Sequence, residues 1–145
     1  MSVTDEQVAA LRAYLAGDLD QHHRLYSRLD RATARSGYTA LVIAAFFEAA
    51  DRRFAQNGTA ADVIEFVGDV RARTEELGEK IDARVAERLI RAVLTDEDIS
   101  DLDDTTKGRY YIVLLAALVA DEQLDPDGLD SFLAEARKLA DRWVD

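Results

Sequence analysis

Apolar side chains recur every three to four residues along almost the whole chain, and this periodicity limits the fold more than any other feature. Leu25, Leu29 and Ala32, for example, share one face of a helix at this spacing. The single proline is Pro126, and no alternating run of β-branched residues marks a strand. The sequence therefore predicts an all-α protein, a helical bundle of about six to eight helices.

Local start signals divide the periodic pattern into separate helices. Thr4 and Gln7 form a capping box at the first start, and Asp125 before Pro126 is a strong signal for the last. The predicted helices cover roughly residues 4–17, 19–35, 39–55, 59–77, 82–94 and 107–123, with a last helix from Pro126 to near Trp143.

Glycines supply the predicted stops. Gly37 is expected to end the second helix, and Asn57–Gly58 the third, because Asn and Gly both tolerate left-handed backbone angles. Gly68 lies inside the fourth predicted helix, where a glycine costs stability, so a close approach of another helix is expected there.

Residues 1–145 are expected to form one domain, because a single hydrophobic core serves about 100–200 residues. The helices at 39–55 and 107–123 are apolar nearly all round, which predicts that they are central. Each continues through a polar turn into an amphipathic helix, so residues 38–74 and 107–143 resemble two half-repeats of a helical hairpin. The alternative is that any two amphipathic hairpins align equally well.

Charge and composition exclude or disfavour several classes of function. The net charge is −11, which disfavours a general binder of nucleic acid or anionic membranes. The chain has no cysteine, so thiolate catalysis and cysteine zinc sites are excluded. Its longest apolar run, residues 110–120, is shorter than the about 20 residues of a membrane span. Residues 1–7 lack the apolar run of a signal peptide, so a cytoplasmic location and no membrane partner are expected.

Arginines form two rows at helical spacing, and these rows are the candidate interaction sites. Both lie opposite the apolar face of their helix, where they are available to an acidic protein segment or another anion. The first row is Arg24, Arg28, Arg31 and Arg35, and the second is Arg84, Arg88 and Arg91. The favoured alternative is internal compensation by acidic residues, including Asp18, Asp20 and the loop at 96–104.

That loop is strongly acidic. It is expected to be a solvated segment or an interaction surface, and like-charge crowding is expected to raise the pKa of some of its carboxyl groups.

A second acidic turn partly fits a calcium-binding loop. Its candidate ligands are Asp121, Asp125, Asp127 and Asp130. Gln123 and Ala134, however, occupy the positions where calcium loops carry a carboxylate and a bidentate glutamate. Helix capping by Asp125 is therefore the favoured interpretation.

No residue pattern indicates catalysis or a cofactor. There is no glycine-rich phosphate loop and no convincing triad, and His22, on an apolar stripe, is expected to be a hydrogen-bonded residue at the edge of the core. The leading hypothesis is a non-enzymatic protein that acts through protein–protein contacts as an adaptor, regulator or immunity-type inhibitor. The alternatives are a module responsive to divalent metal ions and an accessory subunit of a nucleic-acid complex. Self-association is left open.

Overall fold

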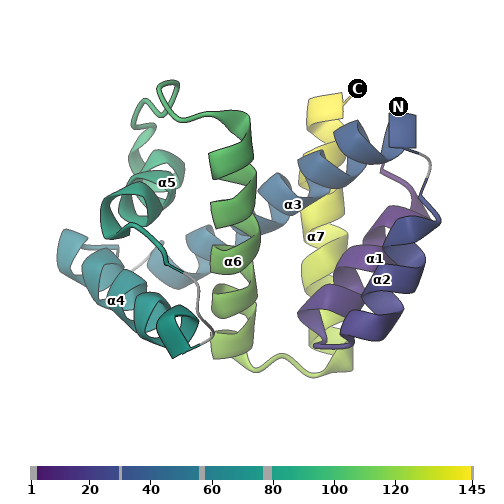
Figure 1. The fold of residues 1–145 in the computed structure, drawn as a ribbon, viewed down its shortest axis with the longest axis horizontal. Coiled ribbons are helices and arrows are strands. Elements are labelled where there is room, and N and C mark those ends of the chain that lie inside the picture. Colours follow the sequence, from purple (N-terminus) through teal and green to yellow (C-terminus); the bar gives the residue numbers. More distant parts are fainter. Residues whose placement is uncertain (1–2, 30, 56–57, 77–79, 145) are drawn as a thin grey trace. The chain divides into compact units, whose positions relative to one another are not determined.

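The chain is all-α, as its periodicity predicts. The computed structural model describes residues 3–29, 31–55, 58–76 and 80–144, and nothing is described of the side chains of residues 31–36, 76 and 144. Within these residues there are seven helices and no strand (Figure 1). The helices are α1 (Asp5–Leu15), α2 (Leu19–Ser27), α3 (Arg31–Phe54), α4 (Ala60–Glu76), α5 (Ala83–Thr95), α6 (Asp104–Glu122) and α7 (Pro126–Val144).

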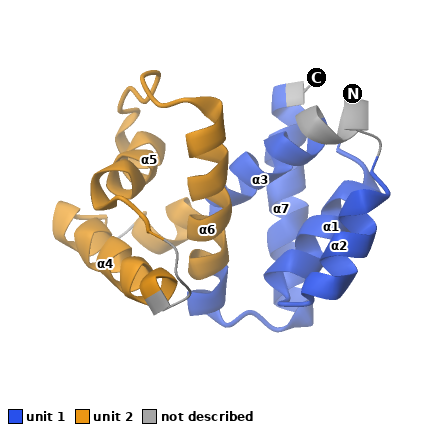
Figure 2. Cartoon of the chain, viewed as in Figure 1, with its two compact units in different colours: residues 1–48, 119–145 blue, residues 49–118 orange. Residues whose placement is uncertain are grey.

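The helices divide into two compact units, which Figure 2 shows in different colours. Unit 1 comprises residues 1–48 and 119–145, and unit 2 comprises residues 49–118. The boundaries fall inside α3 and α6, the two helices predicted to be central, so each contributes buried side chains to both units. The same boundaries cut the proposed half-repeats 38–74 and 107–143, and the single domain stays a prediction.

Unit 1 is held together by contacts between its N-terminal segment and α7. The Val3 amide donates to the Asp141 carboxylate at 2.8 Å, and Arg137 donates to the Val3 carbonyl at 2.6 Å. Arg12 on α1 pairs with Asp130 on α7 at 2.6 Å. These partners are far apart in sequence, so α1 is fixed on α7 by tertiary contacts in addition to its capping box at Thr4.

Unit 2 joins α4, α5 and most of α6. The Tyr110 hydroxyl of α6 accepts from the Asp82 amide, the N-cap of α5, at 2.9 Å. Arg71 of α4 donates to the Ile81 carbonyl at 3.0 Å, so the segment entering α5 is held from both sides. The core of unit 2 is aromatic and aliphatic. The rings of Phe54 and Phe66 are in edge contact there, with 5.8 Å between their centroids.

The predicted single helix over residues 19–35 is wrong, because α2 ends at Ser27 and α3 already begins at Arg31. Gly37 is therefore no stop and lies inside α3. A Cβ at this position would be 2.6 Å from the side-chain amide of the buried Gln7. Glycine thus allows α3 to approach α1 closely, and the chain must turn between α2 and α3 for this packing. Tertiary packing overrides the local periodicity here.

Gly58 and Gly68 also differ from expectation. Gly58 has no left-handed backbone angle, but a Cβ there would lie 2.3 Å from the Phe54 carbonyl oxygen. Gly58 is therefore required for space. Gly68 has no described atom within 4 Å of an added Cβ, so no other helix approaches it. Its cost in the helix, about 1 kcal/mol relative to alanine, is not recovered by any contact among the described residues.

Candidate interaction site

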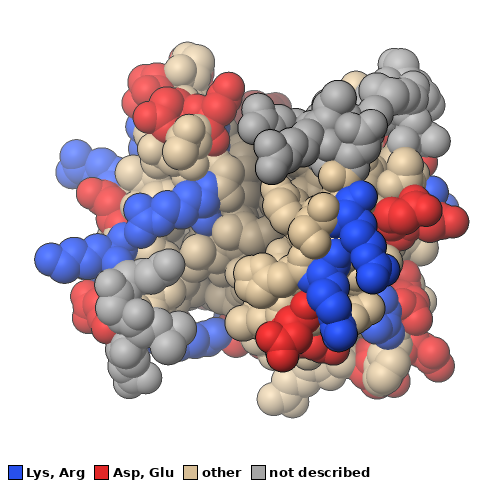
Figure 3. Space-filling view, turned by 45° about the vertical axis from the view of Figure 1, so that its right-hand side comes forward, with Lys and Arg blue, Asp and Glu red and all other residues tan. Residues whose placement is uncertain are grey.

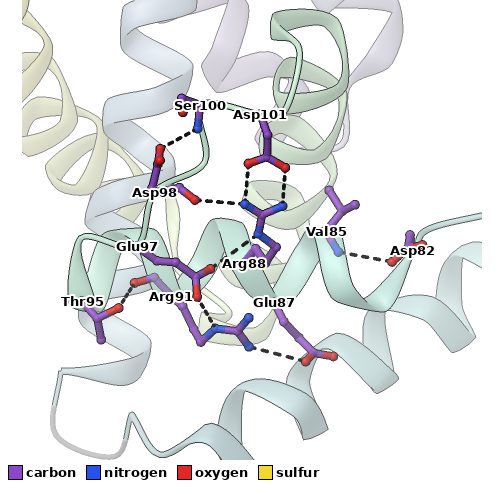
Figure 4. Close-up of polar contacts among 10 residues, drawn as sticks. All are labelled: Asp82, Val85, Glu87, Arg88, Arg91, Thr95, Glu97, Asp98, Ser100 and Asp101. Atoms are coloured by element: carbon purple, nitrogen blue, oxygen red, sulfur yellow. Dashed lines mark hydrogen bonds and ion pairs between the residues drawn. The ribbon is translucent and has the colours of Figure 1, made fainter.

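The α5 arginines bind the acidic loop that follows this helix. Arg88 donates two hydrogen bonds to the Asp101 carboxylate, at 2.8 and 2.6 Å, and a third to the Asp98 carbonyl at 2.9 Å (Figure 4). This paired geometry is the strong form of an arginine–carboxylate contact. Arg88 therefore fixes the loop on α5.

Glu97 joins the two arginines of this network. Its carboxylate lies 3.7 Å from Arg88 Nε and 3.4 Å from Arg91 Nε, and Arg91 also lies 3.7 Å from Glu87 (Figure 4). Arg84, at the start of the row, is exposed and has no ion pair with a described residue. Internal compensation, the favoured alternative for the arginine rows, thus accounts for Arg88 and Arg91.

The expectation that crowding raises carboxyl pKa values in this loop is wrong. The hydrogen bonds from Arg88 lower the pKa of Asp101 to about 2. The Ser100 and Thr106 amides lower the pKa values of Asp98 and Asp103 by donating to them. Donors aimed at the charged form outweigh the repulsion between neighbouring carboxylates.

Asp101→Asn should therefore change how stability depends on pH. A carboxyl group whose pKa is depressed in the folded state stabilises the protein above its ordinary pKa of 3.8, and this contribution is lost as the pH falls through about 2. The difference in Tm between the natural protein and Asp101→Asn is expected to be constant at neutral pH and to shrink between about pH 4 and pH 2. Thermal melting followed by circular dichroism measures it.

Glu75→Gln, at an exposed carboxylate on α4, is the matched control for that titration. A Tm difference for Asp101→Asn that stays constant down to pH 2 would mean that the Arg88–Asp101 pair does not stabilise the fold.

Two of the four proposed metal ligands of the α6–α7 turn, Asp125 and Asp130, have intramolecular roles. Asp125 accepts from the Gly128 amide at 2.6 Å, as an N-cap does, and Asp130 pairs with Arg12. Asp127 is exposed in the first turn of α7, and Asp121 lies at the end of α6. Among the described residues, no three or more of the side chains that bind metals are grouped to hold an ion.

The α2 row is arranged differently from the α5 row. Arg24 lies in α2 and Arg28 is its C-cap, whereas Arg31 and Arg35 belong to α3, so the four do not form one continuous stripe. The side chains of Arg31 and Arg35 lie outside the described residues.

Arg24 and Arg28 are both exposed, and neither has an ion pair with a described residue. Among the described residues, Arg24 donates to Gln21 of its own helix, at 2.8 Å. Figure 3 shows basic side chains gathered over the part of unit 1 that α1 and α2 form. The charge of these two arginines is therefore available to a partner.

An aromatic cluster attaches α2 to its neighbours. His22 shares a hydrogen bond of 2.8 Å between Nδ1 and the Ala10 carbonyl, as expected for a residue at the core edge, and its ring lies 5.3 Å from that of Tyr14. Tyr26 stacks on the edge of Tyr38 at 5.3 Å. Burial, with Tyr26 and Tyr14 nearby, raises the pKa of the Tyr38 hydroxyl.

Two apolar side chains of α2 remain exposed, Leu19 by 52% and Tyr26 by 50%. None of the residues of α2 is fully buried. At helical spacing Tyr26 falls on the same stripe as Leu25 and Leu29, which predicts an inward position, and no signal in the sequence indicates that its side chain is half-exposed. We define the α2 surface as Arg24 and Arg28, which lie one helical turn apart on the same side of α2.

Comparison with known proteins gives no match: no family model matches the sequence, and no curated protein or solved structure matches it significantly. Within the described residues, none of the helices has an apolar stretch long enough to cross a bilayer. Function is therefore inferred from the residues of this chain alone.

Proposed function

We propose that the protein acts through protein–protein contacts and that its α2 surface binds an acidic segment of a partner. One observation carries this proposal: Arg88 and Arg91 of the α5 row are paired with their own loop, whereas Arg24 and Arg28, one helical turn apart, both present their charge to solvent. Local positive charge on a chain of net charge −11 favours a specific acidic ligand over general adhesion to anions. This function fits an adaptor, a regulator or an immunity-type inhibitor.

The residue types of the α2 surface suit such a contact. Guanidinium groups bind carboxylates in pairs of parallel hydrogen bonds, and arginine is enriched where interfaces gain most of their energy. The hydrogen bond of His22 to Ala10 keeps this helix on α1, so the surface is formed before a partner binds.

Charge reversal at both arginines should abolish most of the binding. With a fluorescent synthetic peptide of Glu, Asp, Leu and Phe as the probe, Arg24→Glu with Arg28→Glu is expected to weaken affinity by at least about tenfold, because charge-assisted hydrogen bonds are replaced by repulsion. Fluorescence anisotropy at physiological salt measures the affinity, since low salt exaggerates surface charge effects.

The matched control is Lys80→Glu with Arg142→Glu, which changes the net charge equally at two exposed positions outside the α2 surface. This variant is expected to bind the peptide as the natural protein does. Equal weakening in both double variants would show that only overall charge matters, and the α2 surface would then not be the site.

A further inference from the structure

The outer side of α4 is a helix face that no described residue of unit 2 covers. The inner side of this helix packs in the core through four buried apolar residues, Val63, Phe66, Val67 and Val70. On the opposite side Ile64 is 54% exposed, the highest value among the large hydrophobic side chains of the described residues. Gly68 follows one turn later and is open. This exposed face therefore combines apolar area with space for a close approach.

A groove of about 340 Å³ runs beside this face, between the end of α3 and α4. Its lining residues are Arg53, Phe54, Asp62, Glu65, Phe66 and Asp69. The Arg53 guanidinium lies 5.5 Å from the centre of the Phe66 ring, so a cation already packs on the aromatic floor. The aromatic floor of the groove is thus already covered by a cation of this chain.

The three carboxylates of the groove differ in whether they bind another group of the chain. Asp62 accepts from the Thr59 hydroxyl at 2.8 Å and belongs to the cap of α4. Glu65 and Asp69, one helical turn apart, are exposed and form no ion pair with a described residue. Their spacing of four residues places them in a row along one edge of the exposed face.

We propose that this α4 face, defined as Ile64, Glu65, Gly68 and Asp69, docks an amphipathic helix of a partner protein whose basic side chains meet Glu65 and Asp69. Charge complementarity selects this occupant over a symmetric dimer through the same face, in which the Glu65 and Asp69 carboxylates of the two copies would meet. The missing side chain of Gly68 lets the partner helix come close. The face is on unit 2 and its charge is opposite to that of the α2 surface, so the two proposals stand independently.

The test separates docking from stability. Gly68→Ala should raise Tm by about 2–4 °C, because alanine is the better helix former and the position is open. The same variant is expected to bind the partner helix less tightly, and Gly68→Leu to lose at least about tenfold in affinity. Gly108→Ala and Gly108→Leu are matched controls at an open, exposed helical glycine of α6; they should leave binding unchanged, and the alanine variant should raise Tm similarly.

The probe is a synthetic helical peptide of Ala, Leu and Lys with its lysines along one side, compared with the same peptide carrying Glu for Lys. Anisotropy titration should show binding of the lysine peptide alone, weakened at least about tenfold by Glu65→Gln with Asp69→Gln. Equal binding by the Gly68→Leu and Gly108→Leu variants would overturn the proposal, as would binding of the glutamate peptide. A dimer in sedimentation that Gly68→Leu dissociates would also overturn it, since the occupant would then be a second copy.

Discussion

Phe132→Ala should lower the free energy of unfolding by about 3–5 kcal/mol, the largest loss expected from any single truncation considered for this chain. Phe132 lies on the inner side of α7 and is 0% exposed, among the largest fully buried side chains of the described residues. Truncation removes the burial of a whole ring and leaves a cavity that its neighbours fill only in part. Because small proteins are stable by only about 5–15 kcal/mol, this loss amounts to at least about a fifth of the total stability.

Urea denaturation followed by circular dichroism measures this loss, with Phe132→Leu and Ile64→Ala as comparisons. Phe132→Leu should lose less, because most of the volume is kept. Ile64→Ala should stay within about 0.5 kcal/mol, because the side chain is exposed. If Phe132→Ala and Ile64→Ala lost the same amount, α7 would not pack as described.

Gly58→Ala should destabilise the protein by about 1–3 kcal/mol, although the same substitution stabilises most exposed helices. The added Cβ would lie 2.3 Å from the Phe54 carbonyl oxygen and 3.3 Å from its carbon. Backbone atoms cannot turn aside as a flexible side chain does, so the end of α3 must shift. That shift would disturb the buried contact of Phe54 with Phe66.

Gly108→Ala provides the comparison for Gly58→Ala in the same urea experiment, because no described atom lies within 4 Å of its added Cβ. It should gain about 0.5–1 kcal/mol where Gly58→Ala loses stability. Changes of the same sign in both variants would contradict the close contact at Gly58.

Helix starts were predictable from the sequence because their signals are local. Thr4 and Gln7 form the expected reciprocal cap. Asp82 accepts from the amides of residues 84 and 85, and α7 begins at Pro126. In each case the capping side chain and its partners lie within three residues, so the all-α fold and most helix boundaries followed from neighbouring residues.

The break between α2 and α3 was not predictable, because it depends on residues that are distant in sequence. Gly37 of α3 lies against the side chain of Gln7 of α1. The periodicity of residues 19–35 gives no information about this contact between two helices. The pair of Arg12 with Asp130, 118 residues apart, is equally invisible to local spacing.

The candidate site was predictable in part. Spacing identified the arginines of both rows, and the alternative of internal compensation by the acidic loop correctly describes Arg88 and Arg91. The spacing did not indicate which row of arginines would remain exposed, since this depends on which helix the acidic loop at 96–104 packs against. The sequence also did not predict the lowered pKa of Asp101. A count of charges along the chain does not show that the folded loop brings the Arg88 guanidinium into hydrogen-bonding position on this carboxylate.

Binding of an acidic partner through α2 is most directly tested by affinity capture from a lysate of the source organism, with nuclease and chelator as parallel conditions. The baits are the natural protein, Arg24→Glu with Arg28→Glu, and Lys80→Glu with Arg142→Glu, each followed by titration of the captured protein. We predict one stoichiometric partner that survives both treatments, is lost only by the α2 variant, and binds through an acidic segment. A partner held equally by all three baits, or retention that requires nucleic acid or metal, would contradict this account.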